Sequence, residues 1–480
     1  MMASGLSCAG ASARPNLLII HCDELSYRTL GCYRAQMPKE QAYIWGEGVA
    51  VETPYIDSIA ARGALCTRYF ATSPVCTPSR ASFVSGRYPQ NTGAISNDLP
   101  MKDDVVTFAE ALRRAGYATG YAGKWHLDGE AKPGFTPGRQ FGFEDNRYMF
   151  NRGHWKKLED GPGGPRVAAT DKKGNPTYDV AGADAKSFTT DFLADRAMAF
   201  VEANRDRPFC YMLSIPDPHG PNTVRAPYDT MFDHLDFQAP RTANKAASEA
   251  PAWGGPTGKK AGKSAGMAKY FGMVKCIDDN VGRILEALEE GGLRERTWIV
   301  FTADHGDLCG EHGRHDKGVP YDTSAGIPFV LAAPGKVEPG SVVAEALGTV
   351  DFKPTILALM GVGAPGGDEG RDASHLFSGG GEPGGWRDLT FMRIGGTGKG
   401  ERGWMAAVTS RYKFVVSPGD GPWLFDREAD PWELKNFSGD PGHRDAARML
   451  ATALGDYGAR FHEPLMGAGG VAAALKSASE

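Results

Sequence analysis

The chain has 480 residues, a formal net charge of −5 and a sequence pI near 6.2. This length allows a large core and more than one domain. The charges are mixed along the chain, which gives no reason to expect a nucleic-acid partner. No apolar run is long enough to predict a membrane span.

The N-terminal residues and the cysteines do not indicate a compartment or a cysteine-based metal or redox site. Met1 to Ala13 lacks the charged region and the longer apolar region of a secretory signal. Either a signal was removed and the protein is extracytoplasmic, or the protein is cytosolic. The eight cysteines are scattered without a C-x-x-C pair, which argues against a zinc ribbon or a redox centre.

Apolar runs of strand length alternate with amphipathic helical stretches along most of the chain, which is typical of an α/β fold. The run Asn16 to Cys22 is apolar throughout, as expected for a strand covered on both faces. Further strands are predicted at 116–121, 208–215, 297–302 and 327–332, and helices at 53–64, 106–115, 192–203, 268–288 and 350–360.

The C-terminal part has a different pattern. Residues 361–385 are dominated by glycine and proline and indicate a boundary. The sequence therefore predicts a catalytic α/β domain over residues 14–375 and a smaller unit over residues 386–480. Short strands at 389–393, 404–409 and 413–417, then Asp440 to Phe461 as a helix, predict a small antiparallel sheet with one helix against it.

The stretch around Cys76 begins a helix. Thr77 can cap it, Pro78 fits its first turn, and Gly86 ends it. Cys76 would then lie just before a helix N-terminus, where the helix dipole favours a thiolate of low pKa. Arg80, one turn further on, can lean back towards the cysteine.

The string Cys76-Thr77-Pro78-Ser79-Arg80, followed by Gly86-Arg87, resembles the signature of the type I sulfatases. In that family the cysteine is oxidised after translation to formylglycine (3-oxoalanine). The resemblance implies an alkaline phosphatase-like fold, with a large, mixed, mostly parallel sheet flanked by helices. It also implies a maturation partner for Cys76, either a formylglycine-generating enzyme or an anaerobic maturation enzyme.

Acidic residues and a histidine follow two of the predicted strands, at the sheet edge where open α/β sheets bind ligands. Asp23 and Glu24 follow the first strand, and Asp304 and His305 follow the strand at 297–302. The resemblance implies that these four residues and residue 76 bind a metal, although the family usually has a second aspartate where this chain has Glu24. A carboxylate-rich set suits Ca²⁺, with Mg²⁺ or Mn²⁺ as alternatives.

Basic residues occupy the other positions at which the family places its catalytic groups. Lys124 and His126 stand in G-K-W-H, where an extended backbone would point both side chains the same way. The resemblance implies that Lys124 and Lys317 bind sulfate and that Arg80 holds the formylglycine. It implies that His219 protonates the leaving oxygen and that His126 takes a proton from the formylglycine diol.

Substrate choice is assigned to residues outside this set. The segment Asn146 to Lys157 is either a packed surface loop or a substrate wall, in which Arg152, His154 and Trp155 suit an anionic sugar or an aromatic ring. His315, just before Lys317, is a further candidate for substrate contact.

The sequence thus predicts a sulfuric ester hydrolase acting on a sulfated carbohydrate or an aryl sulfate. One alternative is a phosphodiesterase or phosphonate monoester hydrolase of the same superfamily. The other is an inactive protein that binds sulfated glycans and whose cysteine is never converted.

Overall fold

The computed structural model describes residues 14–243, 250–254, 266–378, 386–395 and 403–479. Its centre is an eight-stranded sheet with the strand order β11-β2-β10-β9-β1-β8-β4-β5. All neighbouring strands run parallel except β10, which is antiparallel to both β9 and β2. The strands are β1 Asn16–Asp23, β2 Ala64–Cys66, β4 Ala118–Lys124, β5 Asp145–Phe150, β8 Phe209–Pro218, β9 Thr297–Ala303, β10 Phe329–Ala332 and β11 Ser341–Val343.

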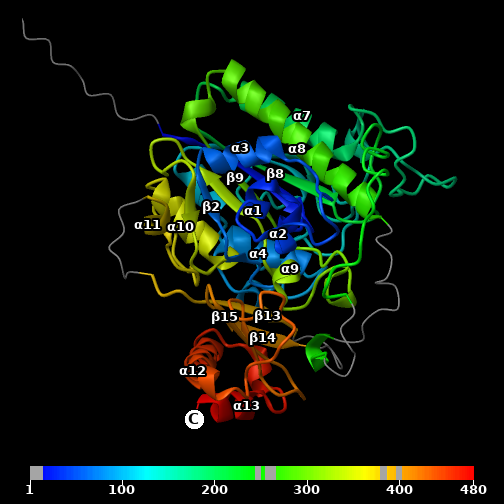
Figure 1. Ribbon diagram of the computed structural model, residues 1–480. Coiled ribbons are helices and arrows are strands. Elements are labelled where there is room, and N and C mark those ends of the chain that lie inside the picture. Colours follow the sequence, from blue (N-terminus) through cyan, green and yellow to red (C-terminus); the bar gives the residue numbers. More distant parts are fainter. Residues whose placement is uncertain (1–13, 244–249, 255–265, 379–385, 396–402, 480) are drawn as a thin grey trace, which may run out of the picture.

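Two groups of helices cover the sheet (Figure 1). The first group is α3 Pro54–Ala61, α7 Thr189–Ala203 and α8 Met267–Glu290, and the second is α4 Cys76–Ser85, α6 Phe108–Arg114 and α10 Phe352–Leu359. Every residue of β1 is buried, as the uninterrupted apolar run predicts. No described helix has the length and apolar character needed to cross a membrane.

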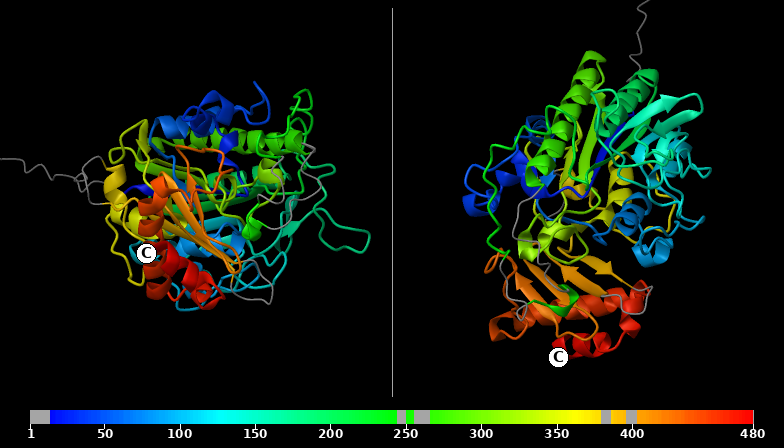
Figure 2. Two further views of the ribbon diagram at one scale, coloured as in Figure 1. Left: turned by 60° about the horizontal axis from the view of Figure 1, so that its bottom comes forward. Right: turned by 90° about the vertical axis from the view of Figure 1, so that its right-hand side faces the viewer.

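A second sheet lies beyond the main body, with helices on its far side (Figure 2). It is antiparallel, in the order β13 Thr390–Ile394, β14 Trp404–Val408, β15 Tyr412–Val416 and β16 Trp423–Asp426. The predicted helix is present as α12 Arg444–Arg460, and a second helix that was not predicted, α13 Val471–Ser479, packs beside it. The predicted fold class is therefore confirmed.

Both faces of this C-terminal sheet are buried, because successive side chains of a strand point to opposite faces. On β14, Met405 and Ala407 join the apolar cluster under α12, whereas Trp404 and Ala406 join a cluster with Tyr321 of the main body. The domain limits at 375 and 386 stay a prediction, and residues 379–385 of that boundary lie outside the described residues, as does Met1 to Ala13.

The remaining elements are short. β3 Tyr69–Phe70 pairs with β12 Leu347–Gly348, and β6 Leu158–Gly161 with β7 Gly164–Val167. The short helices include η1 Tyr27–Thr29, α1 Gly31–Arg34, α2 Lys39–Ala42, α5 Pro89–Thr92, η3 Ala252–Gly254, η4 Arg294–Arg296, η5 Glu311–Gly313, α9 Asp322–Ala325, η6 Thr349–Asp351, α11 Ser374–Phe377, η7 Pro441–His443 and η8 Pro464–Gly467.

Candidate active site

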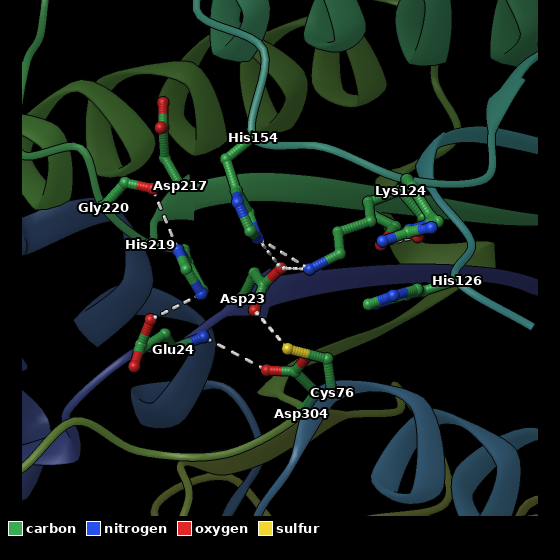
Figure 3. A network of polar contacts seen from close by, with 12 residues as sticks. Asp23, Glu24, Cys76, Lys124, His126, His154, Asp217, His219, Gly220 and Asp304 are labelled. Carbon is green, nitrogen blue, oxygen red and sulfur yellow. Dashed lines mark hydrogen bonds and ion pairs between the residues drawn. The ribbon is translucent and has the colours of Figure 1, made fainter. Parts of the chain in front are cut away.

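Four neighbouring strands, β9, β1, β8 and β4, end at the same edge of the main sheet. The side chains at or just beyond these ends lie together (Figure 3). Asp23 and Lys124 are the last residues of β1 and β4, while His219 and Asp304 directly follow β8 and β9. The parallel topology therefore brings together residues that are up to 281 positions apart in sequence, from Asp23 to Asp304.

Cys76 lies on α4 and faces the ends of β1 and β9. It is the first residue of the helix rather than the residue before it, and Gly86 ends the helix with a φ of 70°. Its Sγ lies 3.2 Å from Nε2 of His305 and 3.6 Å from Oδ1 of Asp23. Burial, reinforced by the Asp23 carboxylate, raises the pKa of the thiol, so the expected low-pKa cysteine is wrong.

Asp23, Cys76, Asp304 and His305 form a group that fits a metal ion. All four are buried, and each offers one ligand atom within 4.8 Å of the others. Nδ1 of His305 lies 3.0 Å from the Gly306 carbonyl, so it carries the proton and leaves Nε2 free to ligate.

The Asp304 carboxylate is held by its surroundings. Its Oδ1 accepts the backbone N–H groups of Glu24 and His305, and its Oδ2 accepts Nε–H of Arg80 at 2.9 Å. Such partners orient a ligating carboxylate before a metal binds.

Glu24, which was predicted to be a metal ligand, contacts two basic groups beside the ligand group. Its φ of 63° turns the residue away from the line of β1. The Glu24 carboxylate lies 2.9 Å from Nε2 of His219 and 3.0 Å from Nζ of Lys317. Burial would raise the pKa of Glu24, but His219 and Lys317 outweigh it and lower this pKa to about 2. Glu24 is therefore an ionised partner of the two basic groups, and its role as a metal ligand stays a prediction.

The Glu24 carboxylate is the main cause of the raised pKa of His219. Burial lowers the pKa of His219, but Glu24 and then Asp23 outweigh burial and raise this pKa above its ordinary value. Lys317, 2.7 Å from the same ring nitrogen, opposes this effect but does not cancel it. The raised pKa favours the protonated imidazole, which is the form that a proton donor requires.

The loop that carries His219 is fixed by a buried ion pair that the sequence did not suggest. Nζ of Lys156 lies 2.5 Å from Oδ1 of Asp217 and donates to the His219 carbonyl at 3.2 Å. Thr190 donates to the other Asp217 oxygen at 2.6 Å. No local pattern predicts this pairing, because Lys156 and Asp217 are 61 residues apart.

Lys124 is fully buried between two acceptors. Its ammonium group pairs with Asp23 and donates to Nε2 of His154 at 2.8 Å. The His154 ring stacks on His219, with centroids 3.5 Å apart and planes 6° apart. Burial, then Lys124, lowers the pKa of His154 well below its ordinary value, so His154 is a neutral acceptor.

Asp23, His154 and His219 also lie close enough together to bind a metal. However, the ammonium groups of Lys124 and Lys317 contact the same side chains. Their positive charge opposes a cation there and favours an anion.

Arg80 is buried beside the ligand group and contacts the Asp23 and Asp304 carboxylates, the former at 3.5 Å. Its Nε contacts Asp304, and its Nη1 donates to the Lys124 carbonyl and to Oγ of Ser214, each at 2.7 Å. Arg80 therefore ties the ends of β4, β8 and β9 together.

His126 lies just beyond the end of β4, two residues after Lys124. β4 ends at Lys124, and His126 has a φ of 64°, so the extended backbone that the sequence suggested is wrong here. Nε2 of His126 lies 3.0 Å from Oδ1 of Asp98, a loop residue that the sequence did not single out. Burial, then Lys124, lowers the pKa of His126, which favours the neutral ring.

The residues predicted to select the substrate have different environments. Trp155 is only 2% exposed and donates to the Arg152 carbonyl at 2.9 Å, so its indole packs in the core and lines no substrate wall. Arg152 is partly exposed and pairs with Asp98 at 2.7 Å. His154 lies inside the site, and His315 is exposed two positions before Lys317.

The segment Asn146 to Lys157 is also not a loop throughout. Its first part is β5, the edge strand of the main sheet.

Comparisons with known proteins show the family of this chain. The family described as Sulfatase matches residues 15–362, and the one described as N-sulphoglucosamine sulphohydrolase, C-terminal, matches residues 310–459. An ulvan-active sulfatase of Formosa agariphila is 29% identical over 401 residues, covering 82% of this chain and 73% of its own. An arylsulfatase of Clostridium perfringens is 28% identical and covers 92% of this chain and 94% of its own.

Solved structures with the same fold include two that bear on function. A protein solved with its substrate D-glucosamine-2-N,6-O-disulfate superposes with a TM-score of 0.75 at 22% identity, covering 94% of this chain and 98% of its own. The phosphonate monoester hydrolase of Agrobacterium radiobacter gives a TM-score of 0.73 at 24% identity, covering 93% and 96%. The match over residues 15–362 spans well over half of the chain, and so this protein belongs to the sulfatase family of the alkaline phosphatase superfamily and is a sulfuric ester hydrolase.

Proposed function

We propose that this sulfatase hydrolyses sulfate esters of carbohydrates or aryl alcohols with a formylglycine formed from Cys76 and a divalent cation. The observation that carries the proposal is the position of Cys76 Sγ within the same group as Asp23, Asp304 and His305. Formylglycine, once hydrated, supplies a nucleophilic hydroxyl and a second hydroxyl whose deprotonation allows sulfate to leave.

The charges of the site fit a cation and an anion bound together. Three carboxylates, Asp23, Glu24 and Asp304, face three fixed cations, Arg80, Lys124 and Lys317. A divalent cation would make the net charge of these groups positive, which favours binding of a sulfate ester. It would also polarise a sulfate oxygen. Two carboxylates with an imidazole suit Ca²⁺ first, with Mg²⁺ or Mn²⁺ as alternatives.

The basic residues act on the substrate at distinct atoms. Lys124 and Lys317 neutralise negative charge on the sulfate oxygens, which increases as the ester bond breaks. His219, protonated beside Glu24, donates its proton to the leaving alcohol oxygen. His126, neutral and buried, accepts a proton from residue 76 when sulfate is released.

The proposal is tested on protein expressed with and without a maturation system. Mass spectrometry of the peptide containing Cys76 measures its conversion, and elemental analysis measures bound metal. Rates are then compared for aryl sulfates, sulfated sugars, a phosphate diester and a phosphonate monoester. A matured enzyme that cleaves the phosphorus esters faster than every sulfate ester would contradict the proposed preference for sulfate.

A further inference from the structure

Three groups outside the metal-ligand group form a chain that ends at His126. Nε2 of His126 contacts Oδ1 of Asp98 at 3.0 Å, and the other Asp98 oxygen pairs with Nη2 of Arg152 at 2.7 Å. Arg152 is itself held by the Glu130 carbonyl, to which its Nη1 donates at 3.0 Å. The His126 carbonyl accepts the hydroxyl of Thr77, the residue after Cys76, at 2.9 Å.

The second ring nitrogen of His126 is Nδ1. Nδ1 is buried and makes no hydrogen bond among the residues that the structure describes. A neutral imidazole has one N–H and one lone pair, and a carboxylate only accepts. Asp98 therefore requires the proton on Nε2, which leaves the lone pair on Nδ1.

We infer that Asp98 is a positioning residue that fixes His126 in the Nε2–H tautomer, and that Arg152 orients Asp98 for this task. The inference rests on the proposed function of His126. In that step Nδ1 accepts the proton of the free hydroxyl on residue 76. The O–H electron pair forms the aldehyde C=O bond. The bond between the residue-76 carbon and the oxygen that carries sulfur breaks, and its electrons leave with the sulfate.

Arg152 then acts in sulfate release, a step that all substrates share, and does not select among substrates. Both nitrogens that Arg152 uses are directed at the protein, one at Asp98 and one at Glu130. Its loss should slow aryl and sugar sulfates to the same degree, because sulfate release is common to all substrates.

The decisive variant is Asp98→Asn, because Arg152 determines which end of the new side-chain amide faces His126. Arg152 has only donors and takes the amide oxygen, so the amide NH₂ faces Nε2 of His126. Nε2 must then accept, the proton moves to Nδ1, and the proton acceptor is lost. We expect kcat/KM to fall by about 10²-fold or more, within the range of general-base contributions.

Removing Arg152 from this variant should restore activity. In the double variant Asp98→Asn/Arg152→Ala, the amide can rotate and offer its oxygen to Nε2–H again. We expect it to be faster than Asp98→Asn alone by roughly tenfold, as for directly coupled neighbours. Matched controls are Asp103→Asn, whose exposed carboxylate pairs with Arg139, and Arg147→Ala, an exposed arginine of the same segment.

A second measurement does not depend on activity. Imidazole ¹⁵N shifts of the unmatured protein report the tautomer, and His126→Gln identifies the signals of His126. The wild type should show a protonated Nε2 and Asp98→Asn a protonated Nδ1.

The outcomes separate the two proposals. An unchanged rate for Asp98→Asn, an unchanged tautomer, or a loss that removal of Arg152 does not relieve would each overturn the positioning role. Absence of sulfatase activity in fully matured wild type would instead refute the proposed function, and the ¹⁵N shifts would still decide the tautomer.

Discussion

Replacing Glu24 by Gln is expected to move the alkaline limb of the pH–rate profile to lower pH. The substitution keeps the shape of the side chain but removes the negative charge beside His219 and Lys317. His219 has a raised pKa, so its acid form persists at a higher pH than that of an ordinary histidine. Without Glu24 this pKa falls, and the proton donor is lost earlier as the pH rises.

The geometry sets the size of the effect. Nε2 of His219 and Oε2 of Glu24 are 2.9 Å apart. Opposite charges centred about 4 Å apart attract by about 4 kcal/mol at an effective dielectric constant near 20. One pKa unit corresponds to about 1.4 kcal/mol, so the alkaline limb should move by at most about three pH units. A shift of about one to three units is usual when a charged partner of this kind is lost.

The assay is kcat/KM against pH for two substrates. An alkyl or sugar sulfate has a poor leaving group and needs the proton, whereas a nitrophenyl sulfate does not. Glu24→Gln should therefore lower the rate of the sugar sulfate more at neutral pH. Glu52→Gln, at an exposed carboxylate, is the control, and thermal melting checks the fold. An alkaline limb that stays in place, or equal losses for both substrates, would refute the role of the Glu24–His219 pair.

Three further predictions address the metal, the nucleophile and the core. Asp304→Ala should abolish turnover and lower the metal content measured by elemental analysis, and full activity after verified removal of all metal would exclude a metal role. Protein that mass spectrometry shows to carry only unmodified Cys76 should have little activity, so full turnover from it would exclude formylglycine. Trp155→Ala should lower the free energy of unfolding by about 3–5 kcal/mol, as for a buried aromatic side chain, measured by denaturant titration. Unchanged stability would show that its burial contributes little.

Long apolar runs made much of the fold predictable. β1, β8, β9 and α8 lie within a few residues of their expected limits, because their buried faces require continuous or periodic apolar residues. β5 was missed because it is an edge strand with polar residues, one of which, Arg147, is exposed. The three-residue strand β2 is too short to give a periodic signal.

The residues of the site were predictable where a strand end or the sulfatase signature marked them. Their directions were less so, because two of them have a positive φ. Glu24 and His126 both leave the extended geometry that strand periodicity assumes, and both make contacts that the sequence did not suggest. Asp98 carries no local signal, since a single aspartate in a loop is ordinary and only the fold brings it to His126.

The C-terminal sheet reaches two of the catalytic loops. The indole N–H of Trp404 donates to the carbonyl of Gly318, the neighbour of Lys317, at 3.1 Å. The backbone N–H of Arg393 donates to the carbonyl of Thr72, four residues before Cys76, at 2.9 Å.

Lys413 strengthens this attachment. It is fully buried, and its ammonium group binds the Pro320 carbonyl and the carboxylates of Asp322 and Glu433. The sheet thus supports two segments of the site at once, the one that leads to Cys76 and the one that carries Lys317. A protein divided into two separately produced halves near residue 380 would accordingly regain activity only when the halves reassociate, and its activity would report their binding.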